Sequence, residues 1–162
     1  MKRRSPWRWV ARVVLRRHGR VKSFEDTMAA SQSLVGRYDA GAAVVPTEKI
    51  IGSVGRAQNL RSDFFYRTGR AMTGRFVRIG AAMQQGRTLP PVDLYKVTRA
   101  PSPGRKRAAS EYYVVDGHHR VAMARKLGQA FLDAHIVAYT VGPIESAADG
   151  TTEAAPDPSA QG

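Results

Sequence analysis

The chain of 162 residues contains no cysteine. Disulfide bonds, thiolate metal ligands and catalysis by a cysteine nucleophile are therefore excluded. The sequence also lacks an apolar run long enough for a transmembrane helix, and no small-residue cleavage site follows an apolar core as in a signal peptide. We therefore expect a cytoplasmic protein, and the length allows one domain with a hydrophobic core.

Acidic residues are scarce relative to basic ones. The sequence has 26 Lys and Arg against 13 Asp and Glu, which gives a net charge of +13. Such a balance indicates an anionic partner, whether nucleic acid, a nucleotide or an acidic membrane surface. The alternative is that the excess of arginine reflects a GC-rich genome.

Both ends of the chain are predicted to lie outside the folded domain. Residues 1–40 are expected to form a basic, helical N-terminal extension. Residues 144–162 have four acids and no base, all residues from Ser146 onward are small or polar, and an acidic disordered tail is expected there. Residues 1–22 contain nine basic residues, and apolar residues recur among them at helical spacing. That segment has three interpretations: a nucleic-acid arm, a helix on a membrane surface, or a helix packed on the domain.

A second helix is expected within the extension. Ser23 is its predicted N-cap, because acidic residues follow in the first turn. Met28, Leu34 and Val35 would form its buried face, and Gly36 would end it.

Residues 41–143 are predicted to form the folded domain. Pro46 confines the first strand to an edge or an end of the sheet, and Gly128 closes the last helix. The expected elements are a strand at 42–46, two short helices between 60 and 85, the second closed by Gly86, strands at 92–97 and 111–115, a helix at 118–127 and a strand at 134–141. This order predicts a compact α+β domain with a small mixed sheet and helices.

Two further segments are basic. The helical region contains four arginines that predict either a ridge for phosphates or a solvated helix face: Arg67, Arg70, Arg75 and Arg78. The insert at 99–110 contains Arg105, Lys106 and Arg107, and it is predicted to be a flexible basic loop between two strands of a hairpin.

The turn Asp116-Gly117 connects an apolar strand to a helix. A helix N-terminus presents free backbone N–H groups and the positive end of the helix dipole, which together suit a phosphate. Gly117 lets the backbone approach the phosphate, and the N–H groups of His118, His119 and Arg120 are expected to donate to it. This strand, turn and helix are the first candidate site.

A second candidate anion loop lies at residues 52–56. Gly52 and Gly55 flank Ser53 and Val54, and Arg56 closes the loop. Ser53 is either a phosphate contact or an ordinary turn serine. Because loops with two glycines are common, a purely structural turn is the alternative for the whole segment.

Read together, these segments resemble the ParB/sulfiredoxin superfamily over residues 43–141, with the strand, turn and helix at 112–128 as the main match. In ParB-type partition proteins the corresponding turn is Gly-Glu-Arg-Arg and holds the phosphates of CTP. In sulfiredoxins it is Gly-Cys-His-Arg and holds those of ATP. The matching residues here are Gly117, His118, His119 and Arg120. The resemblance implies a stand-alone ParB-like domain that binds a nucleoside phosphate (ATP, ADP or CTP), with or without Mg²⁺.

Two departures from the family pattern limit what is carried over. His118 stands where sulfiredoxins have their cysteine, so reduction of a sulfinate is excluded. It also stands where the partition proteins have a glutamate. The Asp-Gly-His-His-Arg form of the turn resembles that of free amino-acid kinases in the same superfamily.

Each polar residue at the turn has an expected role. Arg120 is expected to contact the phosphate directly through its forked guanidinium, and His119 to donate to the same anion. Asp116 has three alternatives: a helix cap, a magnesium ligand or a base. Glu48 and Asp63 are the other acids near the suggested ligand segments, and Glu48 is a further catalytic candidate.

Zinc is not expected at His118 and His119. Adjacent helical residues point about 100° apart and rarely share one metal. His18 and His135 offer no clear third ligand.

Three functions remain open from the sequence. The first is nucleoside-phosphate binding, possible both for a nucleotide-responsive module and for an enzyme. The second is a DNA-binding accessory protein, in which the N-terminal arm with Arg3 and Arg4 and the loop at 105–107 contact the phosphate backbone. The third is a small-molecule kinase or nucleotide hydrolase. Whether the protein dimerises also stays open.

Overall fold

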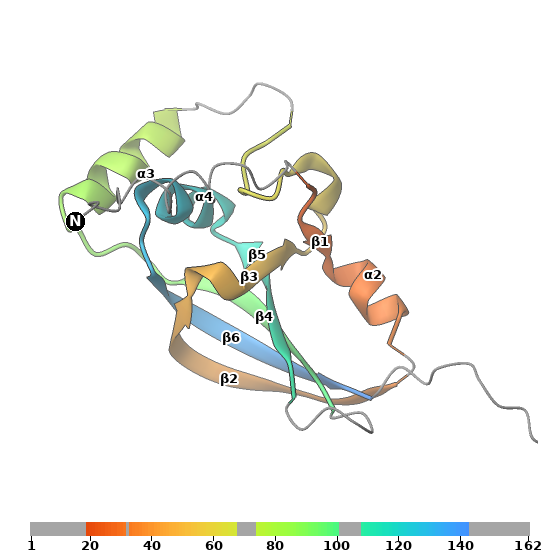
Figure 1. Ribbon diagram of the computed structural model, residues 1–162. Helices are drawn as coiled ribbons and strands as arrows, with labels where there is room; N and C mark the ends of the chain where they lie inside the picture. Colours follow the sequence, from red (N-terminus) through yellow and green to blue (C-terminus); the bar gives the residue numbers. More distant parts are fainter. Residues whose placement is uncertain (1–18, 32, 68–73, 101–107, 143–162) are drawn as a thin grey trace, which may run out of the picture.

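A computed structural model describes residues 19–31, 33–67, 74–100 and 108–142 (Figure 1). The strands are β1 (Lys22–Ser23), β2 (Leu34–Pro46), β3 (Ile50–Ser53), β4 (Val92–Arg99), β5 (Ser110–Asp116) and β6 (Phe131–Val141). The helices are α2 (Phe24–Ala29), α3 (Gly74–Gln84) and α4 (His118–Leu127), with short 3₁₀ turns η1 (Thr47–Lys49) and η2 (Ala57–Asn59).

The six strands form one sheet in the order β1-β3-β5-β4-β6-β2. The pairs β1–β3, β3–β5 and β4–β6 are parallel, whereas β4–β5 and β2–β6 are antiparallel. The sheet is therefore mixed, and the α+β class expected from the sequence is confirmed. Within the described ranges, no helix is long and apolar enough to cross a membrane.

One face of the sheet is covered by α3 and α4, which lie side by side (Figure 1). Side chains that alternate along the strands point to this face and are almost fully buried. The cluster includes Leu94, Val114 and Ile136 from the sheet, Phe76 from α3, and Val121 and Met123 from α4. This larger core fixes α4 against the strands.

The opposite face has a smaller aromatic core beneath α2. The ring of Phe24 lies 5.0 Å from that of Tyr95, 5.2 Å from that of Tyr139 and 5.7 Å from that of Tyr113, with edge-to-face geometry. The hydroxyl of Tyr113 is 2.8 Å from that of Thr27 and donates to Glu111 at 2.8 Å. The buried hydroxyl is thereby satisfied, and α2 is fixed to β5.

The helix predicted after Ser23 is shorter than expected. Ser23 does cap it, since its hydroxyl accepts from the N–H of Asp26 at 3.1 Å, but α2 ends at Ala29. Leu34 and Val35, predicted to be buried in that helix, instead lie in β2 and are exposed. Pairing with β6 along the whole of β2 overrides the helical spacing.

Strand β2 also crosses the boundary expected between residues 40 and 41. Residues 34–40 therefore belong to the same sheet as the domain that follows. Two register shifts interrupt its pairing with β6, one between Leu34 and Gly36 and one between Asp39 and Gly41. Pro46 ends this outermost strand, as expected for proline.

The first of the two helices predicted between 60 and 85 is not formed. Leu60 and Tyr66 form an antiparallel bridge, and the N–H of Arg61 donates to the carbonyl of Phe65 at 2.8 Å. Phe64 has a positive φ of 67° and is buried, with the Arg125 guanidinium 4.9 Å from its ring centroid. Its burial in the core favours a tight turn over a helix.

The remaining elements of the domain agree with the sequence. The second predicted helix is α3, and Gly86 follows it with φ +67°. The hairpin β4–β5 and the strand β6 are present, and α4 ends at Gly128 with φ +70°. Residues 1–18, the basic run Arg105–Arg107 and the acidic tail lie outside the described residues, so the predictions for Arg3, Arg4, Arg105, Lys106 and Arg107 stay predictions.

Gly52 lies in β3, not in a loop. A Cβ atom there would be 2.1 Å from Cδ1 of Tyr113 and 2.8 Å from the carbonyl oxygen of Lys22. The absence of a side chain is what allows the buried Tyr113 ring to lie against the strand.

We therefore expect Gly52→Ala to lower the free energy of unfolding by about 3 kcal/mol or more, because overpacked cores lose roughly 1–3 kcal/mol and backbone also obstructs this Cβ. Gly36→Ala is the matched control, since a Cβ at Gly36 meets no atom within 4 Å. Chemical denaturation of both variants measures the difference. Equal stabilities would contradict the packing role of Gly52.

Candidate anion-binding site at the start of helix α4

The two predicted loops meet at one edge of the sheet. Strands β3 and β5 are parallel neighbours, so their carboxyl ends lie together, and the N–H of Val54 donates to the carbonyl of Val114 at 2.9 Å. The loop after β3 and the turn after β5 are joined directly, because Ser53 Oγ lies 2.7 Å from His118 Nε2. The sequence identified both loops but could not show that they are neighbours.

Two features of the position of Gly117, its backbone conformation and the space around it, favour glycine. Its φ is +96°, in the left-handed region, and a Cβ would lie 2.7 Å from Cγ1 of Val92 and 3.0 Å from Nη2 of Arg120. The N–H groups of His118 and His119 begin α4 and have no acceptor within the helix. The N–H of Arg120, expected to face a phosphate, donates instead to the carbonyl of Gly117 at 2.8 Å.

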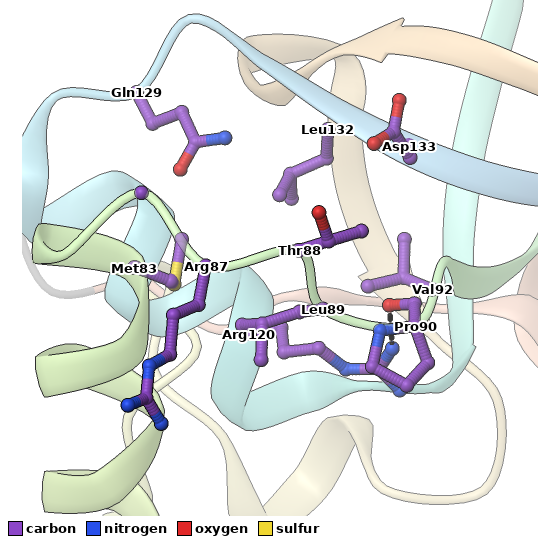
Figure 2. A pocket seen from close by; sticks show the side chains of 11 residues that line it. Met83, Arg87, Thr88, Leu89, Pro90, Val92, Arg120, Gln129, Leu132 and Asp133 are labelled. Carbon is purple, nitrogen blue, oxygen red and sulfur yellow. Dashed lines mark hydrogen bonds between the residues drawn. The ribbon is translucent and has the colours of Figure 1, made fainter.

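The Arg120 side chain connects the turn to the segment that enters β4. Its Nη1 donates to the carbonyls of Pro90 and Pro91, the latter at 2.7 Å, and its Nη2 donates to Asp116 Oδ2 at 2.9 Å (Figure 2). The side chain is only 13% exposed. A guanidinium has five N–H groups. These contacts therefore leave part of its donor capacity for an anion, and Arg120 also has a structural role.

His118 and Ser53 form a buried pair. Ser53 is 0% and His118 5% exposed. Burial, with a smaller contribution from the charge of Arg56, lowers the pKa of His118 to about 4. The imidazole is therefore neutral at pH 7, and the pair links β3 to α4 beneath the surface. Direct contact of the Ser53 hydroxyl with a phosphate, one of the two alternatives left by the sequence, would require this pair to open.

His119 is half-buried among basic and aromatic side chains. Its ring lies 5.9 Å from that of Tyr66 and 6.0 Å from that of Phe76. Burial and then the charges of Arg75 and Arg56 lower the pKa of His119 below its ordinary value. The loop after β3 and helix α3 thus bring two arginines near the first turn of α4.

Arg75 was not among the site residues expected from the sequence. The sequence indicated only that Arg75 lies on a basic helix face. Its proximity to His119 arises from the packing of α3 on α4. Arg56 was expected at the site, and its Nη1 donates to the hydroxyl of Tyr66 at 3.2 Å. The proximity of Arg75 to His119 and the hydrogen bond between Arg56 and Tyr66 both depend on tertiary structure and could not be predicted from the sequence.

A carboxylate already occupies the loop at Gly55. The N–H of Gly55 donates to Glu25 Oε1 at 2.8 Å, and the hydroxyl of Ser23 donates to Oε2 at 2.9 Å. Although burial opposes the shift, the hydrogen bonds to Glu25 lower the pKa of its carboxyl group. The N–H of Gly55, expected to bind a phosphate, is therefore used within the protein.

The three acids that the sequence suggested near the ligand segments, Asp116, Glu48 and Asp63, do not lie together. Asp116 is next to the turn and pairs with Arg120, but it does not cap α4, whose N-cap is Gly117 without a side-chain bond. Glu48 lies in η1, before β3 and at the end of that strand opposite to the site. Asp63 is bonded to Arg61 at 2.8 Å. Among the residues that the structure describes, no three His, Asp or Glu side chains form a group that could hold a metal ion.

The fold and this site define a small α+β domain with a basic helix N-terminus at one edge of a mixed sheet. No family profile matches the chain, and no curated protein matches it. Among solved structures, the chain is similar to the crystal structure of sulfiredoxin from Arabidopsis thaliana, with 20% identity and a TM-score of 0.39 over 61% of this chain and 86% of that chain.

The buried pair makes the stability of the fold depend on pH. An unfolded histidine gains a proton as the pH falls through about 6.5, whereas His118 in the fold does so only near pH 4. The unfolded state therefore binds more protons between these values, and stability should fall by up to about 3 kcal/mol from pH 6.5 to pH 4.

His118→Gln keeps a hydrogen-bonding side chain but cannot titrate. We expect its free energy of unfolding to depend less on pH in this window than that of the wild type. Urea denaturation at pH 7, 6, 5 and 4.5 measures both slopes, and parallel slopes would contradict the assignment.

Proposed function

We propose that the protein is a ParB/sulfiredoxin-like domain that binds a nucleoside phosphate at the start of α4. The observation that carries the proposal is the convergence of Arg56, Arg75 and His119 on the first turn of a helix that has no acidic residue there. These groups come from three separate segments of the chain. The helix dipole adds further positive potential at the same place.

Arg56 and Arg75 bring two positive charges near the ring of His119. Burial and then these two charges disfavour protonation of His119 and lower its pKa. A phosphate at the turn would offset the repulsion and accept hydrogen bonds from the N–H groups of His118 and His119. Perturbed pKa values cluster at functional sites, and this supports the same position.

The structure also offers room for the rest of a nucleotide. A groove of 560 Å³ runs along α3 from Arg75 and Arg78 to Ala82 and Leu89. A phosphate bound between Arg75 and His119 would leave the nucleoside beside this groove. ATP, ADP and CTP all remain candidates.

If a magnesium ion accompanies the phosphates, Asp116 is the acid that we propose as its ligand. Its side chain is 65% exposed, and it directly precedes the phosphate-binding turn. Turnover of the nucleotide would need this acid or another group to position an acceptor. Binding is the proposed function, and hydrolysis or transfer would show as product formed only when magnesium is present.

Arg56→Ala and Arg75→Ala should each weaken nucleotide binding by about 10-fold or more, because a hydrogen bond to a charged group contributes roughly 1.5–3 kcal/mol. Lys126→Ala is the matched control, since Lys126 is an exposed base in the last turn of the same helix. Calorimetry with ATP, ADP and CTP, with and without Mg²⁺, measures the affinities. A wild-type protein that binds none of them, or losses equal to that of Lys126→Ala, would refute the proposal.

Arg120→Ala is a poorer test of the same site. Removing this side chain would leave the carbonyls of Pro90 and Pro91 without their donor, so that lost binding could follow from a changed turn.

Binding should also be linked to protonation of His119. A nearby phosphate raises the lowered pKa of His119, so that the complex takes up a proton between the free and the bound pKa. Affinity should therefore rise as the pH falls from 7.5 to 6. Calorimetry at pH 6 in two buffers of different ionisation enthalpy measures the uptake. His119→Asn should abolish it, and uptake that persists in this variant would place the proton elsewhere.

A further inference from the structure

The groove along α3 begins at the candidate anion site and continues away from it. Arg75 is near His119 and also lines the groove, so this one residue connects the two. The rest of the lining comes from α3 and from the segment that follows it: Arg78, Ile79, Ala81, Ala82, Gln85, Arg87 and Leu89. A ligand with a phosphate at the first turn of α4 can therefore extend along these residues.

Part of the groove is apolar. Ile79 packs against the larger core, and Ala82 and Leu89 are half-buried. Because Ala81 and Ala82 end at Cβ, the groove keeps its volume of 560 Å³ between longer side chains. Apolar lining with a few polar groups is typical of sites for small organic ligands, and it suits the ring of a base.

Two cations of the groove lie on one face of α3. Arg75, Arg78 and Ala82 are separated by three and four residues, which places them on the same side of the helix. Arg78 is about 4.5 Å further along the helix axis than Arg75, since each residue adds about 1.5 Å. Arg78 is therefore the next positive side chain for a ligand that extends from the first turn of α4.

Arg87 is brought to the same groove by the end of the helix. The N–H of Gly86 donates to the carbonyl of Met83 at 3.1 Å, and that of Arg87 donates to the carbonyl of Ala82 at 2.9 Å. These two bonds are the pattern of a Schellman cap, at which the chain turns. Figure 2 shows the Arg87 side chain running along α3. Arg87 thus adds a third cation to the groove, and it also lines a separate cavity beside residues 86–92.

The charges of Arg78 and Arg87 are not used within the described part of the protein. Among the described residues, neither guanidinium makes a hydrogen bond or an ion pair, and no acidic side chain lines the groove. Both side chains are exposed. Guanidinium groups match the geometry of phosphate oxygens. Two such groups beside an apolar surface, next to a first phosphate site, fit a ligand that carries a second phosphate beyond an apolar ring.

We propose that the ligand of this groove is a nucleotide with phosphates on both its 5′ and its 3′ hydroxyl groups. The 5′-phosphate binds at the first turn of α4 beside Arg75, and the 3′-phosphate binds Arg78 and Arg87. The base and the ribose contact Ile79 and Leu89. A 3′-phosphate leaves the ribose at a different carbon from the 5′-phosphate, so it is available to this second group of cations. The proposal rests on nucleotide binding at α4, and it names the class of nucleotide.

Three ligands separate the second phosphate from the first. ADP and adenosine 3′,5′-bisphosphate are isomers with two phosphates each, but ADP carries both on its 5′ side, and AMP has the 5′-phosphate alone. Calorimetry on the full chain measures the three affinities. The bisphosphate should bind at least about 10-fold more tightly than AMP, because hydrogen bonds to a charged group contribute this factor or more.

Variants of the full chain assign the second phosphate to its cations. Arg78→Ala and Arg87→Ala should each weaken binding of the bisphosphate by about 10-fold and change that of ADP by less than about 2-fold. Arg75→Ala should weaken both isomers, since Arg75 lies at the first phosphate. Lys126→Ala removes an exposed cation from the last turn of α4 and should change neither.

The results that overturn this proposal differ from those that overturn nucleotide binding itself. If ADP binds but the bisphosphate binds no more tightly than AMP, or if Arg78→Ala and Arg87→Ala weaken both isomers equally, the second phosphate site is refuted and the first stands. If the wild type binds none of the three ligands, both proposals are refuted.

A second phosphate can come from a free nucleotide or from a polynucleotide. The dinucleotide of adenosine with a 5′-phosphate carries a phosphodiester at its first 3′ position, and it is titrated in the same way. Tighter binding of the dinucleotide than of the bisphosphate identifies the end of a polynucleotide as the ligand, and weaker binding identifies a free bisphosphate. Each result supports a second phosphate site when Arg78→Ala reduces the affinity of the tighter ligand, and an affinity that Arg78→Ala leaves unchanged contradicts it.

Discussion

The hydrogen bond between Ser53 and His118 is the constraint on which the rest of the site depends. It joins the end of β3 to the start of α4, which directly follows β5, the parallel neighbour of β3. A buried hydroxyl and a buried imidazole are tolerated only because each satisfies the other. The surface groups of the two loops, Arg56 and His119, are therefore placed by a contact that is itself hidden from solvent.

Arg120 connects this edge of the sheet to the segment before β4. Its guanidinium lies close to Gly117 and donates to the carbonyls of Pro90 and Pro91. One side chain thereby connects the turn to the segment before β4 and also lines the cavity beside residues 86–92.

The elements that could be predicted from the sequence are those specified by local signals. The turn at Gly117 and the C-cap at Gly128 bound α4, and a polar insert between two apolar runs predicts the hairpin of β4 and β5. Leu34 and Val35 were assigned wrongly because their strand is stabilised by pairing with β6, about 100 residues away. For the same reason, the partners of Ser53 and the contact of Glu25 with Gly55 could not be seen in a local pattern. The candidate site was located by its turn, but its cations were assembled by packing.

The two register shifts in β2 have a consequence for contacts between molecules. This strand is the outermost of the sheet, and apolar side chains such as Leu34, Val35 and Val44 are exposed along it. A regular edge of that length would be a template for another strand, and such templates lead to aggregation. The bulges between Leu34 and Gly36 and between Asp39 and Gly41 change the direction of the backbone N–H and C=O groups, so a regular ladder of hydrogen bonds cannot continue across them. The irregularity of β2 therefore protects the sheet against uncontrolled growth at this edge.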